Sequence, residues 1–128
     1  MNSAEMRALV DRYIEAYNRM DVAGMLLRLH PDVEFENISG GVVNASAKGT
    51  AELKELAEQS LALFAERTQV ILSFESSETR AVASIGFHAV LADDFPNGMK
   101  KGQVLNFTGR SEFEFRDGAI SKLTDITA

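Results

Sequence analysis

Cysteine is absent from the 128-residue chain, and histidine is scarce. Without cysteine there is no disulfide framework, no thiolate nucleophile and no thiolate metal site. The two histidines, His30 and His88, lie far apart, and the chain has no His-x-x-x-His or Glu-x-x-His spacing of the kind that metal sites show. Gly40-Gly41 lacks the lysine and helix that follow the glycines of a phosphate-binding loop. We therefore expect neither a metal ion nor an organic cofactor.

Basic patches and long apolar segments are missing as well. The formal net charge is −6, and Lys100-Lys101 is too short to form a phosphate-binding surface, so nucleic acid is not an expected partner. No apolar run approaches the ~20 residues that cross a bilayer. Residues 1–12 also lack the charged-then-apolar pattern of a signal peptide. These absences favour a cytoplasmic protein without a membrane partner.

The composition itself is that of an ordinary globular domain. Hydrophobic residues make up 45% of the chain and charged residues 25%, which is typical of folded domains. A chain of this length buries roughly two thirds of its unfolded surface. No internal repeat or linker divides the sequence, so residues 1–128 are predicted to form one domain.

The clearest local pattern is a β-hairpin near the end of the sequence. Residues 109–115 alternate between Gly, Ser or Phe at odd positions and Arg or Glu at even positions, which predicts a strand with one face on a core. Asp117-Gly118 tolerates the positive φ angles of a two-residue turn. A second strand begins at Ala119 and carries an acid, Asp125, near its end. Both faces of that strand mix polar and apolar residues, so periodicity does not place the acid.

Two helices are predicted at the beginning of the sequence. Residues 3–20 carry an apolar stripe at helical spacing, with Asn2 and Glu5 at the positions of a capping box. A second, shorter helix is predicted over residues 21–29, with Asp21 as its cap. Pro31 is expected to end it, because proline disfavours helical geometry in the residue before it.

A strand and a third helix follow. Residues 33–38 alternate so that Asn37 shares a face with Phe35. The next segment, ISGGVVNASAKG at residues 38–49, shows no regular pattern. Thr50 is the predicted cap of the third helix, whose apolar stripe runs through Leu53, Leu56, Ala57, Leu61 and Phe64.

The rest of the chain has the pattern of strands. The apolar face is formed by even positions in residues 70–74 and by odd positions in residues 80–91, which leaves His88 on the opposite face. Residues 103–115 form the next strand. Helices first and strands last predict an α+β fold, with the helices gathered on one face of a mostly antiparallel sheet. Long strands wrapped around a few helices leave a cone-shaped pocket.

Four segments together resemble the nuclear transport factor 2-like superfamily, in its SnoaL-like bacterial branch. These segments are RYIEAYNRMD (12–21), PDVEFENISG (31–40), KGTAELKEL (48–56) and FEFRDGAISKLTDI (113–126). The resemblance implies a cone-shaped barrel of strongly curved, mostly antiparallel sheet with three helices packed on its concave face. It also implies a deep apolar pocket and commonly a homodimer. Its members include isomerases, hydrolases, cyclases, dehydratases and non-catalytic binding domains, so the fold alone names no reaction.

Ketosteroid isomerases of this superfamily share one of three functional groups with the chain. Tyr13 matches their pocket tyrosine in the first helix. Asn37 stands at the position of their general base, and a neutral amide cannot abstract a proton. Ser111 stands where they carry a protonated acid. The standard ketosteroid isomerase reaction is therefore not expected.

Limonene epoxide hydrolases resemble the chain at other positions. Their Tyr-x-Asn motif is matched by residues 35–37, which keep the asparagine and lose the phenol. The acid of their last strand is matched by Asp125, and their central Arg-x-Asp by residues 92–94, which lose the arginine. An acid and an amide would suffice to activate water, while the electrophilic side is incomplete.

The candidate site follows from both resemblances. The expected catalytic group is Asp125 as acid or base, Asn37 to position water or a substrate oxygen, and Tyr13 as hydroxyl donor. Each has a structural alternative: a solvated acid, an asparagine that closes a strand end, and a core tyrosine. The expected substrate-binding residues are Tyr17, Phe35, Phe87, Phe107, Ser111, Phe113 and Phe115.

Two hypotheses of function remain open from the sequence. In the first, the chain is a cofactor-independent isomerase, hydrolase or cyclase acting on a small apolar molecule. In the second, it is a non-catalytic ligand-binding or dimerisation module with a vestigial pocket. A homodimer would form through the outer sheet face, which carries His88, Arg110, Glu112 and Glu114. The direction of Asn37 and Asp125, toward one cavity or toward opposite sides of the sheet, discriminates between them.

Overall fold

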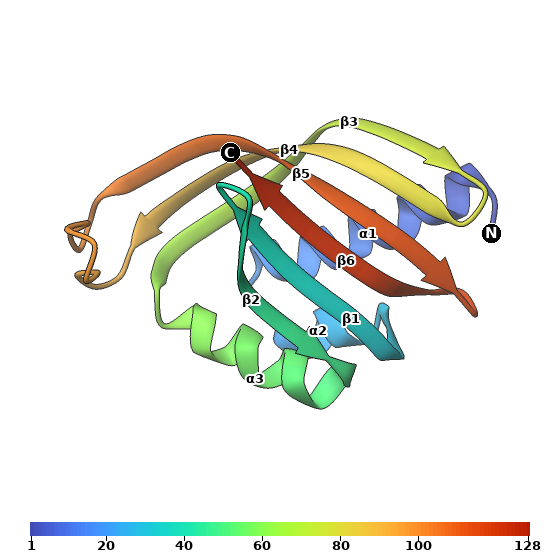
Figure 1. The fold of residues 1–128 in the computed structure, drawn as a ribbon, viewed down its shortest axis with the longest axis horizontal. Helices are drawn as coiled ribbons and strands as arrows, with labels where there is room; N and C mark the ends of the chain where they lie inside the picture. Colours follow the sequence, from blue (N-terminus) through green and yellow to red (C-terminus); the bar gives the residue numbers. More distant parts are fainter.

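The computed structural model describes all residues from Met1 to Ala128. Three helices and six strands follow one another along the chain (Figure 1). The helices are α1 (Ser3–Asn18), α2 (Val22–Leu26) and α3 (Gly49–Leu61). The strands are β1 (Leu29–Ser39), β2 (Val42–Lys48), β3 (Phe64–Ser77), β4 (Arg80–Leu91), β5 (Val104–Arg116) and β6 (Ala119–Thr127).

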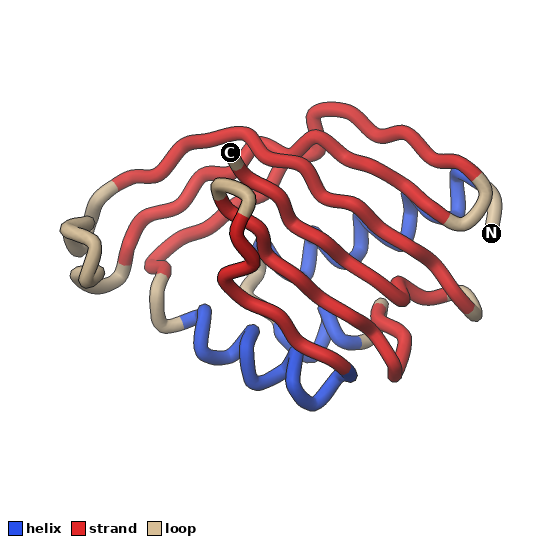
Figure 2. The backbone as a smooth tube through the Cα atoms, viewed as in Figure 1, coloured by secondary structure: helices blue, strands red, loops and turns tan.

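All strands belong to one strongly curled sheet in the order β2-β1-β6-β5-β4-β3. Only the pair of β1 and β6 is parallel, and the other neighbours are antiparallel. Figure 2 shows the three helices on the concave side, where α1 packs beside β3 and α3 packs beside β1 and β2. The predicted α+β fold is confirmed. The sheet curls without closing, because β2 and β3 remain edge strands.

The beginnings of the first two helices follow the sequence prediction. Asn2 and Glu5 form a complete capping box, each side chain bonding the other residue's backbone N–H at 2.9 Å. Asp21 caps α2 by accepting from the Gly24 backbone N–H at 2.9 Å. The end of α2 was predicted wrongly. Residues 29–31 already belong to β1, where Pro31 falls in the stretch in which the pairing with β6 is interrupted, so its missing N–H breaks no ladder bond.

The segment after β1 is a strand and not an irregular loop. Gly40 and Gly41 have φ angles of 58° and 79°, the geometry of a two-residue hairpin turn that connects β1 to β2. β2 is an exposed edge strand of small residues, so it carries no hydrophobic alternation to find. Thr50 does not cap α3, which begins at Gly49. Instead, Glu52 accepts a bond from the Lys48 backbone N–H at 3.0 Å.

Bulges exchange the two faces of β3 and β6. In β3 the pairing shifts between Ile71 and Ser73, so Ile71 and Phe74 both pack against the core. Val70 and Leu72, predicted on the apolar face, are 54% and 59% exposed on the outer face. In β6 the pairing with β5 shifts before residue 122, which turns both Ile120 and Leu123 into the core.

The core lies between the concave face of the sheet and the helices. Its largest fully buried side chains include Met6 and Val10 of α1, Val33 of β1 and Leu123 of β6. The odd positions of β4 face this core as predicted, and His88 lies on the outer face, where it bonds Asn106 at 2.9 Å. No helix is long and apolar enough to cross a membrane. The core fills one end of the curled sheet, and the other end holds a pocket.

Candidate functional site

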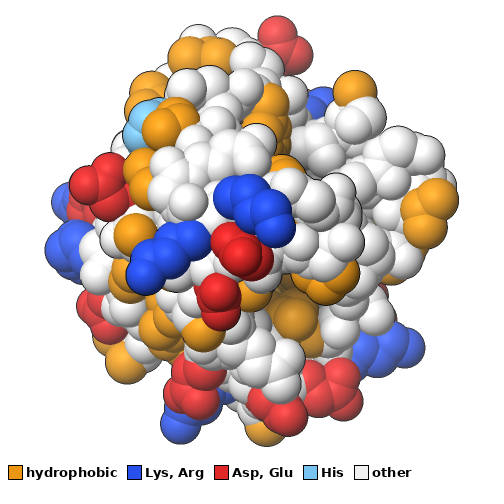
Figure 3. Space-filling view, turned by 90° about the vertical axis from the view of Figure 1, so that its left-hand side faces the viewer, with side chains coloured by type: hydrophobic (Ala, Val, Ile, Leu, Met, Phe, Trp, Pro, Cys, Tyr) orange, Lys and Arg blue, Asp and Glu red, His pale blue; other side chains and the backbone are white.

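A pocket of about 400 Å³ lies between the curled sheet, α1 and α3. Fifteen of its 25 lining residues are hydrophobic, which makes an apolar body a better occupant than a charged one. In Figure 3 the surface at this end of the molecule has a hollow with hydrophobic atoms at its base, among charged side chains of both signs. The apolar lining includes Phe35, Leu53, Leu56, Phe64, Phe87 and Phe107.

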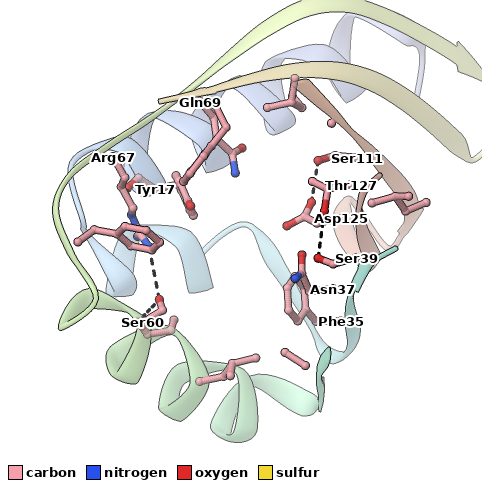
Figure 4. Close-up of a pocket in the computed structure, with 18 of the residues that line it drawn as sticks. Tyr17, Phe35, Asn37, Ser39, Ser60, Arg67, Gln69, Ser111, Asp125 and Thr127 are labelled. Carbon is pink, nitrogen blue, oxygen red and sulfur yellow. Dashed lines mark hydrogen bonds between the residues drawn. The ribbon is translucent and has the colours of Figure 1, made fainter. Parts of the chain in front are cut away.

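One wall carries a polar row that crosses three strands. Asp125 of β6 lies opposite Asn37 of β1 on one side and opposite Ser111 of β5 on the other. Strand register thus places the three side chains next to one another, because residues directly opposite in a ladder share a face. All three line the pocket, as Figure 4 shows. Ordinary alternation puts Asp125 on the same face as the buried Leu123, and the bulge before residue 122 lets Ile120 face the same side.

The Asp125 carboxyl group is held in a largely apolar setting. The pKa of Asp125 is raised to about 6. Burial raises it, because an ionised carboxylate loses water there, and a hydrogen bond from Ser111 partly opposes this effect. The Ser111 hydroxyl donates to Asp125 Oδ1 at 2.7 Å. The second carboxyl oxygen has no hydrogen bond to the protein. An acid with this pKa changes its protonation state close to neutral pH, which suits proton transfer.

Asn37 belongs to a side-chain network at the end of β1. Its Nδ2 donates to Asn44 Oδ1 at 2.7 Å, and Asn44 Nδ2 donates to Ser39 at 3.2 Å. Ser39 in turn bonds Thr127 at 3.0 Å. A bulge in the pairing of β1 and β2 turns Asn44 toward Asn37, so the network depends on the strand that the sequence did not reveal. It fixes the Asn37 amide at the pocket wall.

Both tyrosines of α1 line the pocket. Burial is the main reason that the pKa of Tyr13 is raised, and the charge of Asp125 adds to it. Burial also raises the pKa of Tyr17, while the nearby Arg67 opposes the shift. Both hydroxyl groups therefore stay protonated around neutral pH and are available as donors.

Arg67 of β3 is the lining residue that sequence reasoning missed. It is only 4% exposed, and its guanidinium group lies 3.7 Å from the centroid of the Tyr17 ring. Nε donates to the Tyr17 carbonyl at 3.2 Å, and Nη1 donates to Ser60 Oγ at 3.4 Å. The missed signal was the alternation of Arg67 and Gln69 with Ile71. It places all three on the inner face once Ile71 is assigned inward.

The predicted aromatic wall is only partly present. Phe35, Phe87 and Phe107 line the pocket, and Phe64 joins them. The rings of Phe87 and Phe107 are 4.9 Å apart between centroids.

Phe113 and Phe115 do not line the pocket. Both are buried in the hydrophobic core, where their rings stack at 6.3 Å. They share a face with Ser111 but lie farther along β5, beyond the polar row and inside the packed end of the sheet. The prediction that they form part of the ligand wall is therefore not met by the geometry. Strand parity gives a face and cannot tell a cavity from a filled core.

The pocket has polar groups on two opposite sides with an apolar space between them (Figure 4). Asp125, Asn37 and Ser111 lie on one side, and Arg67 and Tyr17 lie on the other. No group of three or more histidine, aspartate or glutamate side chains is placed to hold a metal ion. The chemistry that these side chains can supply is proton transfer together with hydrogen bonding to substrate oxygens.

A family model described as the SnoaL-like domain matches residues 10–123. Among solved structures, a polyketide cyclase candidate from Xanthomonas campestris pv. campestris has a TM-score of 0.79 at 24% identity, covering 100% of this chain and 93% of that chain. AclR, a hydroxylase candidate from Streptomyces galilaeus, has a TM-score of 0.77 at 24% identity, covering 97% and 89%. TerC, co-crystallised with polyporic acid, has a TM-score of 0.78 at 18% identity, covering 97% and 92%.

At these identities the structural neighbours show a common fold. A search of curated proteins gave no match. The family model, in contrast, covers most of the chain, including the second half of α1, the strand that carries Asn37 and the helix that closes the pocket. The chain belongs to the SnoaL-like domain family.

Proposed function

We propose that the chain binds a small, largely apolar carbonyl compound in this pocket and catalyses proton transfer on it, with Asp125 as acid and base. One observation carries the proposal: the Asp125 carboxyl faces an apolar pocket with its pKa raised to about 6. Perturbed acids in clefts are typical of catalytic sites. The reaction type is that of a cofactor-independent isomerase or cyclase, with hydrolysis through an activated water as the related alternative.

The proposed step is proton abstraction next to a carbonyl group. Ionised Asp125 takes a proton from the substrate carbon, and the electron pair of the C–H bond moves to form an enolate. The developing negative charge on oxygen needs a donor, and the hydroxyl of Tyr13 or Tyr17 supplies one in its protonated form. Asp125 then returns the proton at another carbon. In a cyclase the enolate carbon instead attacks a second carbonyl carbon of the same molecule, and the alkoxide that forms takes the proton back from Asp125. No redox partner is needed.

The neighbouring structures support this reaction class by analogy. One is a polyketide cyclase candidate, and TerC was crystallised with an organic acid. The pocket volume of about 400 Å³ is within the range of sites for small organic ligands. The similarity in fold favours a substrate of this kind, while the position of Asp125 in the pocket supports proton transfer as the reaction.

Deuterium exchange tests the proposal whatever the product of the reaction is. A thermal-shift screen of aromatic ketones, lactones, epoxides and steroids first identifies ligands, because native-state ligands raise the unfolding temperature. Each ligand with an acidic C–H is then incubated with the protein in deuterated water and followed by NMR. We expect exchange catalysed by the wild type and lost in Asp125→Asn, with ligand affinity kept. Asp93→Asn, in an exposed loop, is the matched control.

A second function is favoured by one feature of the site. The Asn37 amide N–H is bonded to Asn44, so it does not point freely at a ligand. In a non-catalytic binding module the polar row would orient a ligand without reacting with it. Ligand binding without any exchange in the wild type would support that reading and contradict the enzyme.

We also propose a homodimer formed through the outer face of the sheet. Val70 and Leu72 of β3 are exposed hydrophobic residues. Val70 lies opposite Gly86, and Leu72 packs over Gly86, so the two form one apolar area over β3 and β4, with the exposed Val82 farther along β4. Such areas are typical of association surfaces. Sedimentation should show a dimer that Leu72→Glu converts to a monomer. A monomeric wild type at micromolar concentration would contradict the dimer.

A further inference from the structure

The side of the pocket opposite Asp125 contains a buried cation without a counter-ion. Arg67 extends from β3 across the pocket wall to α1 and α3, where it contacts the Tyr17 carbonyl and Ser60 Oγ. Both of these acceptors are neutral. No carboxylate oxygen lies within 4.0 Å of its guanidinium nitrogens, since the ion pairs of the chain involve other residues. Buried arginines ordinarily have an anionic partner, because an isolated buried charge is costly.

The guanidinium group also has unused hydrogen-bond donors. It carries five N–H groups, and the protein bonds of Arg67 use one on Nε and one on Nη1. Nη2 is buried and has no hydrogen-bond partner. Neighbouring side chains cover it, so contact with a ligand requires a small movement of these side chains. An unpartnered N–H pair on a buried cation is an incomplete site for an acceptor.

The surroundings of Arg67 define the shape of that acceptor. The guanidinium carbon of Arg67 lies 3.7 Å from the centroid of the Tyr17 ring, and Nη2 has no hydrogen-bond partner. A guanidinium edge matches two oxygens of a carboxylate or of a conjugated enolate in one plane. Phe64 lies near the same end of β3 and forms an edge-to-face pair with Phe87, at 6.0 Å between centroids. These rings favour a flat, apolar body next to the oxygens.

We propose that Arg67 is an oxyanion-binding residue and that the pocket takes a planar, largely apolar molecule carrying a carboxylate or an ionised enol. The anionic end would lie at Arg67 and Tyr17, and the remainder of the molecule would extend toward Asp125. Ionised Asp125 repels an anion, so the two charged side chains together fix one orientation of the ligand. This substrate class rests on the proposed function of the same pocket. Binding of an anion at Arg67 is nevertheless a separate property, because it does not depend on proton transfer by Asp125.

Matched pairs of probes test the proposal on the wild-type protein. The carboxylate pair is 2-naphthoate and 2-naphthamide. The enol pair is 2-hydroxy-1,4-naphthoquinone, which is ionised at neutral pH, and its neutral methyl ether. We expect calorimetry to show that at least one anion binds about 10- to 100-fold more tightly than its neutral partner, the range of a charge-assisted hydrogen bond. The pair that shows the preference distinguishes a carboxylate from an enolate. Equal affinities within both pairs would overturn the proposal.

Three variants assign the preference to Arg67. Arg67→Gln should abolish the preference for the anion and change the affinity for the neutral probe less than about threefold. Arg67→Lys keeps the charge without the planar edge and should retain a reduced preference for the anion. This variant provides the test if Arg67→Gln does not fold. Arg12→Gln removes an equal charge from an exposed ion pair with Glu15 and should keep the full preference. A preference unchanged in both Arg67 variants would overturn the assignment.

The outcome is separable from the proton-transfer reaction. Asp125→Asn should keep or increase the preference for the anion, because it removes a negative charge from the same pocket. If the protein prefers anions but catalyses no deuterium exchange, the role of Arg67 is supported and the proposed catalytic function is contradicted. If it catalyses exchange but shows no preference for anions, the catalytic function is supported and the role of Arg67 is contradicted.

Discussion

Ser111 Oγ donates a hydrogen bond of 2.7 Å to Asp125 Oδ1 across the paired strands β5 and β6. Ser111 is itself buried, so the bond is shielded from water. It opposes the effect of burial on the carboxyl group and keeps the pKa of Asp125 at about 6 instead of higher. Burial and this one hydroxyl, acting in opposite directions, thus set the pH range in which the candidate base is ionised.

Replacement of Ser111 should therefore raise the pKa of Asp125. In Ser111→Ala the carboxylate loses a donor that stabilises its charged form, while burial remains. Carbon-13 NMR titration of the aspartate carboxyl groups measures the shift directly. If the protein is an enzyme, the acidic limb of its pH–rate profile should move upward in the same variant. Ser73→Ala, on an exposed position of β3, is the control. An unchanged or lowered pKa in Ser111→Ala would show that the bond does not act on the carboxylate.

Burial of Asp125 should also make the fold less stable as pH rises. Its pKa is raised from 3.8 to about 6, so between these values the folded state holds a proton that the unfolded state has released. Stability from this group is therefore greatest below about pH 4 and is lost as pH rises to about 6. The shift of about two units corresponds to at most about 3 kcal/mol.

The comparison of wild type with Asp125→Asn isolates this contribution, because all other titrating groups are common to both proteins. In urea denaturation at a series of pH values, the variant should gain stability relative to the wild type as pH rises. This difference in unfolding free energy should level off above about pH 6. A difference that stays constant across this range would contradict a raised pKa in the folded state.

Phe113 and Phe107 should respond differently to truncation, although they lie on the same strand. Phe113 is 2% exposed in the core, so Phe113→Ala should cost about 3–5 kcal/mol of unfolding free energy. Phe107 is 45% exposed at the pocket, and Phe107→Ala should cost far less while weakening ligand binding. Denaturant unfolding and calorimetry on the two variants measure both quantities. Similar losses of stability would contradict the assignment of Phe113 to the core.

The sequence predicts most of the fold because local signals and the global arrangement agree. The Asn2 capping box, the Asp21 cap and the Asp117-Gly118 turn all mark real element boundaries. Each depends on residues close together in the chain, so a pattern of a few letters contains the information. The odd positions of β4 likewise face the core over the whole strand, because its pairing with β5 has no bulge. Regular elements are readable from their period.

The site was less predictable because irregular pairing creates it. A bulge in β3 turns Ile71 inward and exposes Val70, and a bulge in β6 lets Ile120 face the same side as Leu123 and Asp125. Each bulge shifts the side-chain alternation by one residue, so every later residue of the strand faces the side opposite to the one predicted from its period. Arg67 was missed for the same reason. The resemblance to a family supplied the interest in Asn37 and Asp125, and only the pairing register shows that the two lie side by side.

Gly109 should be intolerant of a side chain because β6 passes close to it. A Cβ atom there would lie 2.9 Å from the backbone oxygen of Ile126 and 3.1 Å from Thr127 Cγ2. The backbone oxygen cannot turn aside as a side chain can, so Gly109→Ala has to displace the end of β6 next to Asp125. We expect a loss of about 1–3 kcal/mol in the free energy of unfolding, as for overpacking, and a weaker affinity for any pocket ligand.

Gly86 provides the matched control on the neighbouring strand. A Cβ atom at that position meets only the side chain of Leu72, at 3.7 Å, which is an ordinary contact. Gly86→Ala should therefore keep or raise stability by up to about 1 kcal/mol, because alanine loses less backbone entropy on folding than glycine. Urea denaturation of the two variants gives the comparison. Equal stability of Gly109→Ala and Gly86→Ala would mean that β6 moves away from the added methyl group without loss of stability. The close approach of Gly109 would then not determine the position of β6 and Asp125.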